Sequence, residues 1–139
     1  MKELVLLHPG SKLPQWVESL ERMTFEAPWG ALEHHECLLG LPPHAYARWS
    51  AIPAAQEAEL LRLAVSREAR RQGLARHLLE ASEAHLRSLG IATLHLEVRP
   101  SNQAARILYE AMDWKVQRTR KAYYQDGEDA LIYQKTLDL

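Results

Sequence analysis

The sequence predicts a mixed α/β fold built around one central β-sheet of about seven strands. Strand-like and helical patterns follow one another in the order β, α, β, β, β, α, β, α, β, β, which is typical of helices packed on a shared sheet. The length of 139 residues fits one domain and leaves little room for two. The sequence contains no internal repeat and no low-complexity tract. We therefore expect a single domain over residues 1–139.

One helix is expected in the first half, over residues 13–23. Trp16, Val17 and Leu20 fall on one stripe of this segment, as they do on the buried side of an amphipathic helix. Pro28 then biases the residue before it toward an extended backbone, so the helix must end before it.

Four strands are expected to accompany this helix. They are placed at residues 4–7, 35–41, 44–52 and 57–65. Pro42 and Pro43 mark the turn between the second and third strands. A helix over residues 32–39 is the alternative to the second strand.

The second half has clearer signals. Leucines at helical spacing predict a helix over residues 72–89, which Gly90 ends. A strand over residues 91–98 follows, and Ser101 is expected to cap a helix that continues through Met112. The last two strands are placed at residues 114–124 and 129–137, joined by the Asp126-Gly127 turn signal.

Composition argues against several classes of protein. Lys and Arg number 17 against 18 Asp and Glu, so the net charge is −1, and a nucleic-acid binder usually has a basic excess. The apolar run at residues 4–7 is too short for a signal-peptide core or a membrane span. Cys37 is the one cysteine, so no internal disulfide is possible. We expect a cytoplasmic protein with no membrane or nucleic-acid partner, and the sequence leaves its oligomeric state open.

No metal site is expected. The run His34-His35-Glu36-Cys37 holds metal-binding residue types, but neighbours in a strand point in opposite directions and no second cluster accompanies them. The four tryptophans are expected in the core, with contact to a peptide substrate as the alternative for Trp29. They are Trp16, Trp29, Trp49 and Trp114.

The segment most informative about chemistry leads from a strand end, Leu63-Ala64-Val65, into a helix start, Arg70-Arg71-Gln72-Gly73-Leu74-Ala75-Arg76. The first backbone N–H groups of a helix have no internal partner and carry partial positive charge, so they suit an anion. Gly73 would let the backbone approach a phosphate, and the three arginines would add forked donors.

The alternative for this segment is a solvated basic helix start. Arginines at that end of a helix oppose its dipole, so without a bound anion they repel one another. The segment lacks the Gly-Lys-Ser/Thr ending of a P-loop and the three glycines of a Rossmann motif.

These residues resemble a known family. Arg70-x-x-Gly73-x-Ala75 matches the Arg/Gln-x-x-Gly-x-Gly/Ala signature of the GNAT acyltransferases. Later runs resemble the branch of that family that acetylates the N-terminal alanine of a ribosomal protein. They are Leu96-Glu97-Val98-Arg99-Pro100-Ser101-Asn102, Ala104-Ala105, Leu108-Tyr109-Glu110, Arg120-Lys121-Ala122-Tyr123-Tyr124 and Glu128-Asp129-Ala130-Leu131-Ile132. The resemblance covers residues 57–137, and before them only Ala27-Pro28-Trp29 matches.

The resemblance implies the GNAT fold and acetyl-CoA as co-substrate, with no metal. It implies that acetyl-CoA is bound by residues 70–76 and by the strand end Leu63, Ala64 and Val65, whose backbone would hold the thioester carbonyl. Asn102 would either contact the pantetheine arm or position the helix that follows it.

By the same resemblance, Glu97 is the general base and Tyr109 is the general acid. The alternation of its strand places Glu97 on the face opposite Leu96 and Val98. A free carboxylic acid has a pKa of about 4.3 and an α-amine about 8, so the transfer needs either a buried carboxylate or an ordered water that relays the proton. A phenol, with a pKa of about 10, can protonate a departing thiolate.

Two departures from the family pattern stand out. Ala75 replaces the usual second glycine, and Asp113-Trp114 replaces the usual Gly-Phe, so Asp113 must adopt a positive φ or the turn must avoid one.

The favoured function is acetyl transfer from acetyl-CoA to the α-amine of a protein, with a ribosomal-protein alanine as the target. A small-molecule amine acceptor and a non-catalytic CoA-sensing module are the alternatives. The presence of both Glu97 and Tyr109 argues against the non-catalytic CoA-sensing module.

Overall fold

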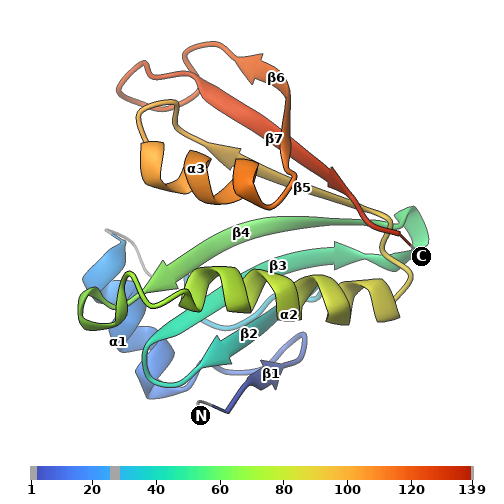
Figure 1. Cartoon of the computed structure of the whole chain (residues 1–139). Helices are drawn as coiled ribbons and strands as arrows, with labels where there is room; N and C mark the ends of the chain where they lie inside the picture. The colour runs from blue at the N-terminus through green and yellow to red at the C-terminus, as the bar shows by residue number, and fades with distance from the viewer. Residues whose placement is uncertain (1–2, 26–28, 139) are drawn as a thin grey trace.

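The computed structural model describes residues 3–25 and 29–138. Within them the chain forms seven strands and three α-helices (Figure 1). They are β1 (Val5–Leu7), α1 (Gln15–Thr24), β2 (Glu36–Leu41), β3 (Ala45–Ile52), β4 (Glu57–Val65), α2 (Leu74–Ser88), β5 (Thr93–Val98), α3 (Gln103–Ala111), β6 (Lys115–Arg120) and β7 (Ala130–Thr136). This order confirms the predicted α/β arrangement. The alternative helix over residues 32–39 is wrong, because β2 occupies half of that segment.

The strands form one mixed sheet in the order β1-β2-β3-β4-β5-β7-β6. The central pair, β4 and β5, is parallel, and the other neighbours are antiparallel. A parallel pair needs a crossover connection, and α2 supplies it here.

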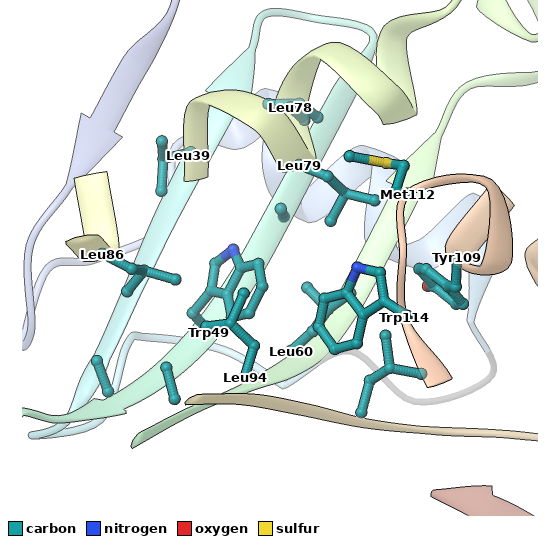
Figure 2. Packing of buried hydrophobic residues seen from close by; sticks show 14 of the residues in the cluster. Leu39, Trp49, Leu60, Leu78, Leu79, Leu86, Leu94, Tyr109, Met112 and Trp114 are labelled. Atoms are coloured by element: carbon teal, nitrogen blue, oxygen red, sulfur yellow. The ribbon is translucent and has the colours of Figure 1, made fainter. Parts of the chain in front are cut away.

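The helices bury apolar side chains on both faces of the sheet. α2 and α3 pack on one face, where Trp49 and Trp114 lie side by side in the main core with exposed fractions of 0% and 1% (Figure 2). α1 covers the other face through Val17 and Leu20. Trp29 is 46% exposed, so its expected place in the core is wrong. Its neighbours Ala27 and Pro28, with which it matches the family pattern, lie outside the described residues.

A β-bulge in β4 changes which side chains face the main core. Trp49 of β3 pairs with Leu60, but the preceding Arg48 pairs with Arg62, so Leu61 is the extra residue. Before the bulge Leu60 faces the main core, and after it Leu63 does. The strand therefore keeps an apolar face although its alternation shifts by one residue.

The same region is where β4 and β5 separate. Their pairing ends with Leu60 opposite Leu96, although β4 continues to Val65 and β5 to Val98. Figure 1 shows the two strands close together at one end and apart at the other. The sheet is open at its centre as a result.

The two ends of α3 bear on two of the sequence predictions. Asn102 caps α3, since its Oδ1 accepts a hydrogen bond from the backbone N–H of Ala105 at 3.2 Å, so the cap predicted at Ser101 is wrong. Ser101 instead donates its backbone N–H to Glu128 at 2.9 Å. Asp113 has a φ of +70°, one of the two outcomes expected from its missing glycine.

Candidate active site

A cavity of about 250 Å³ lies where β4 and β5 separate. Four of the residues singled out from the sequence line it, although they come from three different elements and a cap: Leu63, Glu97, Asn102 and Tyr109. The other lining residues were not predicted as site residues, and Phe25, Arg62 and Tyr124 are among them. Ala64 is buried on the α1 side of the sheet and does not line this cavity.

Glu97 is held in this cavity by the end of β6 and the loop that follows it. Its side chain is 25% exposed, and its Oε1 accepts a hydrogen bond from Nη1 of Arg120 at 3.2 Å. Hydrogen bonding to the Glu97 carboxylate raises the pKa of Tyr123, whose ring lies 4.8 Å from the Arg120 guanidinium. The carboxylate therefore has defined partners.

Tyr109 approaches the cavity from α3. Its ring is buried, with a centroid 5.8 Å from that of Trp114 and 6.2 Å from that of Tyr133. Burial raises the pKa of the Tyr109 hydroxyl to about 12. The phenol therefore remains protonated, and able to donate its proton, throughout the physiological range.

A second cavity of about 260 Å³ meets the first at Glu97. Glu57 and Glu59 of β4 line it, with His95 of β5 and Arg118 of β6. The pKa of Glu59 is raised, first by burial and then by the charge of Glu97. Carboxylates outnumber the one arginine on this side of Glu97, which suits a cationic acceptor.

The start of α2 is arranged as the sequence predicts. Gly73 precedes the helix with a φ of +74°, and no side chain of the described residues caps the helix. A Cβ at Gly73 would meet nothing within 4 Å, so the space above the free N–H groups is open. Arg71, with a φ of +64°, completes a tight turn. These features fit an anion at the helix start.

The neighbouring arginines differ in their present contacts. Arg70 donates its Nε–H to the carbonyl of Val65 at 3.2 Å, which ties the loop to the end of β4. Arg76 pairs with Glu80, one helical turn later, at 3.0 Å. Both pairs are exposed, so either arginine can exchange its partner for a phosphate at small cost.

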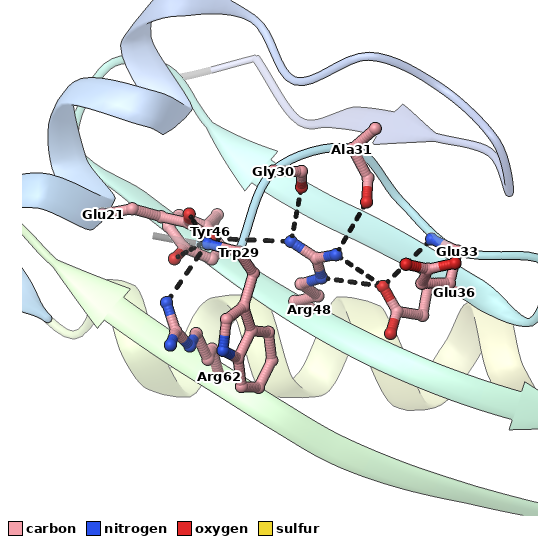
Figure 3. A network of polar contacts seen from close by, with 9 residues as sticks. All are labelled: Glu21, Trp29, Gly30, Ala31, Glu33, Glu36, Tyr46, Arg48 and Arg62. Carbon is pink, nitrogen blue, oxygen red and sulfur yellow. Dashed lines mark hydrogen bonds and ion pairs between the residues drawn. The ribbon is translucent and has the colours of Figure 1, made fainter. Parts of the chain in front are cut away.

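A buried ionic network centred on Glu21 adjoins the first cavity through Arg62 (Figure 3). Glu21 of α1 is fully buried and accepts a hydrogen bond from the Tyr46 hydroxyl at 3.0 Å, with Arg48 at 3.6 Å and Arg62 at 3.8 Å. Its other oxygen accepts the backbone N–H of Trp29 at 3.0 Å.

Arg48 and Arg62 connect this network to the segment after α1. Arg48 donates to the carbonyls of Gly30 and Ala31, both at 3.0 Å. Arg62 lies 3.7 Å from the centroid of the Trp29 ring and also lines the first cavity. The network therefore fixes one wall of the cavity. Arg62 is the one arginine inside the apolar run of β4, and it was the signal in the sequence that could have indicated this network.

The comparisons with known proteins agree with this geometry. Residues 5–114 match the sequence family described as the Acetyltransferase (GNAT) family. The chain belongs to this GNAT family. It is 48% identical over 79 residues to the [Ribosomal protein bS18]-alanine N-acetyltransferase of Escherichia coli (strain K12), a match that covers 55% of this chain and 53% of that protein. It is 39% identical over 83 residues to an N-alpha-acetyltransferase of Saccharolobus solfataricus, covering 59% of this chain and 50% of that one. The chain thus spans about half the length of the curated relatives it matches.

Solved structures show the same GNAT architecture over nearly the whole chain. The crystal structure of the ribosomal-protein-S18-alanine N-acetyltransferase from Escherichia coli superposes with a TM-score of 0.77 at 30% identity, covering 99% of this chain and 96% of that one. Arabidopsis thaliana NAA60, solved in complex with a bisubstrate analogue, gives a TM-score of 0.80 at 13% identity and covers 98% of this chain, which shows the fold alone.

Two kinds of feature are absent from residues 3–25 and 29–138. Their His, Cys, Asp and Glu side chains form no group of three or more that could hold a metal ion. None of the helices in these ranges is long and apolar enough to cross a membrane.

Proposed function

We propose that this GNAT protein transfers the acetyl group of acetyl-CoA to the α-amine of a protein N-terminus, with an alanine-starting ribosomal protein as the favoured acceptor. The observation that carries the proposal is the meeting of Glu97 and Tyr109 in one cavity at the split between β4 and β5. The similarity to the Escherichia coli enzyme that acts on ribosomal protein bS18 supports this acceptor. In this proposal residues 1–139 act as one domain in the cytoplasm.

The residues present fit acetyl-CoA. An anion suits the uncapped start of α2, where Gly73 leaves open space and arginines 70, 71 and 76 carry compensating charge. We propose that residues 70–76 hold the pyrophosphate and that the backbone of residues 63–65 borders the path of the pantetheine arm. Asn102 lines the cavity and caps α3, so it both borders this path and positions the helix of Tyr109.

When bound, acetyl-CoA supplies the acetyl thioester. Glu97 takes a proton from the acceptor ammonium, directly or through a water, and this frees the nitrogen lone pair. The new N–C bond forms as the C–S bond breaks. Tyr109 gives its proton to the departing sulfur, and the second proton lost by the nitrogen returns to Tyr109 through solvent. Because burial keeps the pKa of Tyr109 near 12, complete transfer to a thiolate is uphill, so we expect this proton to stabilise the sulfur as its charge develops.

The bulged residue of β4 suits the third requirement, which is stabilisation of the carbonyl oxygen. Leu61 has no paired residue in β3, because it is the extra residue of the bulge. It has none in β5 either, because the pairing of β4 with β5 ends at Leu60. It also lines the cavity. We propose that backbone N–H groups between Leu61 and Val65 take this role.

The test is turnover of acetyl-CoA against defined acceptors, with mass detection of the product. The acceptors are an alanine-starting peptide, the same peptide with a blocked N-terminus, and a panel of amino acids and polyamines. We expect acetylation of the free peptide alone. Turnover confined to the small amines would overturn the proposed acceptor, and absence of turnover with every acceptor would overturn the proposed reaction.

A further inference from the structure

Glu97 already has a cationic partner before any acceptor is present. Arg120, the last residue of β6, contacts the carboxylate at 3.2 Å. An acceptor ammonium that gives its proton to Glu97 must approach the same carboxylate. The guanidinium and the acceptor therefore compete for one position.

The surroundings of Arg120 show that it can be displaced. Its side chain is 46% exposed and belongs to a strand that is exposed along its whole length. Exposed ion pairs are weak and exchange partners easily. The guanidinium already lies over the ring of Tyr123, 4.8 Å from its centroid, and it can keep this contact when it leaves the carboxylate.

Arg99 provides a contrast close by. It pairs with Asp126 at 2.8 Å and Glu128 at 3.0 Å, and its guanidinium lies 3.9 Å from the centroid of the Tyr124 ring. Three partners hold Arg99 in place, and these contacts tie the loop after β6 to the end of β5. Arg120 has the looser arrangement of the two, and it is the one on the proposed base.

The groups around Glu97 carry charges of both signs. On one side, Glu57 and Glu59 of β4 line the cavity with His95 of β5 and Arg118 of β6, and on the other side Arg62 of β4 and Arg99, which follows β5, line it with Tyr109 and Tyr124. Arg120 and Tyr123 contact the carboxylate directly.

We propose that Arg120 is a positioning residue that occupies the acceptor's place on Glu97 and is displaced by the acceptor ammonium. In the free enzyme it orients the carboxylate. On binding, the ammonium takes over the contact with Glu97, and Arg120 keeps its contact with the Tyr123 ring. This inference rests on the proposed function, because it takes Glu97 as the base for an amine acceptor.

The test compares Arg120→Gln with Arg120→Lys and with a matched control, Lys115→Gln, which removes one positive charge at the far end of the same strand. KM and kcat for an alanine-starting peptide are measured for each. We expect Arg120→Gln to lower the peptide KM by about twofold or more, the scale of an exposed ion pair, while kcat changes less than KM.

Arg120→Lys should restore the peptide KM toward that of the wild type, and Lys115→Gln should leave it unchanged. A rise in peptide KM for Arg120→Gln would show that Arg120 binds the acceptor instead, and an unchanged KM would show that it has no role; either result overturns the inference. Both leave the proposed function standing if the wild-type protein acetylates the peptide. Absence of wild-type turnover overturns the proposed function and this inference together.

Discussion

Glu97 of β5 and Tyr109 of α3 line the same cavity, although one belongs to the sheet and the other to a helix packed on it. Glu97 is partly exposed at the mouth, and Tyr109 is buried. A carboxylate near solvent can exchange protons with water, and a buried phenol stays protonated. This difference in environment suits the roles that we propose, a base at Glu97 and an acid at Tyr109.

Replacing Glu97 by Gln keeps the shape of the side chain and removes its ability to accept a proton. We expect kcat to fall by about 10²–10⁴-fold, the usual contribution of a general base, with the affinity for acetyl-CoA unchanged. Steady-state rates and calorimetric titration with acetyl-CoA measure the two quantities. Turnover within about twofold of the wild type at neutral pH would remove Glu97 from this role.

Replacing Tyr109 by Phe removes one oxygen and leaves the ring in its place beside Trp114 and Tyr133. We expect kcat to fall by about 10²-fold while the affinity for acetyl-CoA stays within about twofold. Because burial raises the pKa of Tyr109 to about 12, the wild-type enzyme should show no loss of kcat from its ionisation below about pH 11. A more acidic acyl-donor thiol should partly rescue the variant, and normal turnover with acetyl-CoA would make Tyr109 a packing residue.

Replacing Gly73 by Val tests the site at the start of α2. The substitution fills the open space above the free N–H groups and strains a backbone with a φ of +74°. Gly90→Val is the matched control, since it imposes the same strain, at a φ of +83°, beyond the other end of this helix. We expect a large loss of acetyl-CoA affinity by calorimetry for the first variant alone. Equal affinities for the two variants would contradict the assignment.

Replacing Glu21 by Gln tests the network that supports the cavity wall. The carboxylate is fully buried among Arg48, Arg62 and Tyr46, so its loss leaves buried positive charge. We expect the free energy of unfolding in urea to fall by about 3 kcal/mol. Glu80→Gln breaks a pair in which both side chains are 57% exposed and should cost about 0.5 kcal/mol or less. Similar losses for the two variants would show that the buried network does not contribute more than a surface pair.

Sequence patterns identified the parts of the site that depend on local chemistry. The turn before α2 follows from a glycine and arginines at fixed spacing, and the structure gives it the uncapped helix start that an anion needs. Strand alternation placed Glu97 on the face opposite Leu96, and the burial of alternate β5 residues agrees. Both features are properties of short segments, so their neighbours in the chain were enough to predict them.

The parts that depend on distant contacts were not predicted. β4 and β5 separate after Leu60 and Leu96, and this depends on the pairing of two strands that α2 separates in the chain. The bulge at Leu61 depends on the pairing of β4 with β3. Glu21 looks like a surface residue of an amphipathic helix until Arg48 meets it from another element. The N-cap was misplaced by one residue because Ser101 and Asn102 are both good caps, and Glu128 binds the first of them.

The central claim is acetyl transfer to an N-terminal α-amine, and one measurement tests it most directly. An alanine-starting peptide that also contains an internal lysine is incubated with the wild-type protein and acetyl-CoA, and fragment masses locate the product acetyl group. The account predicts one acetyl group on the α-amine, absent when Glu97→Gln replaces the wild type under the same conditions. Acetylation of the lysine in place of the α-amine, or no acetylated peptide at all, would contradict it.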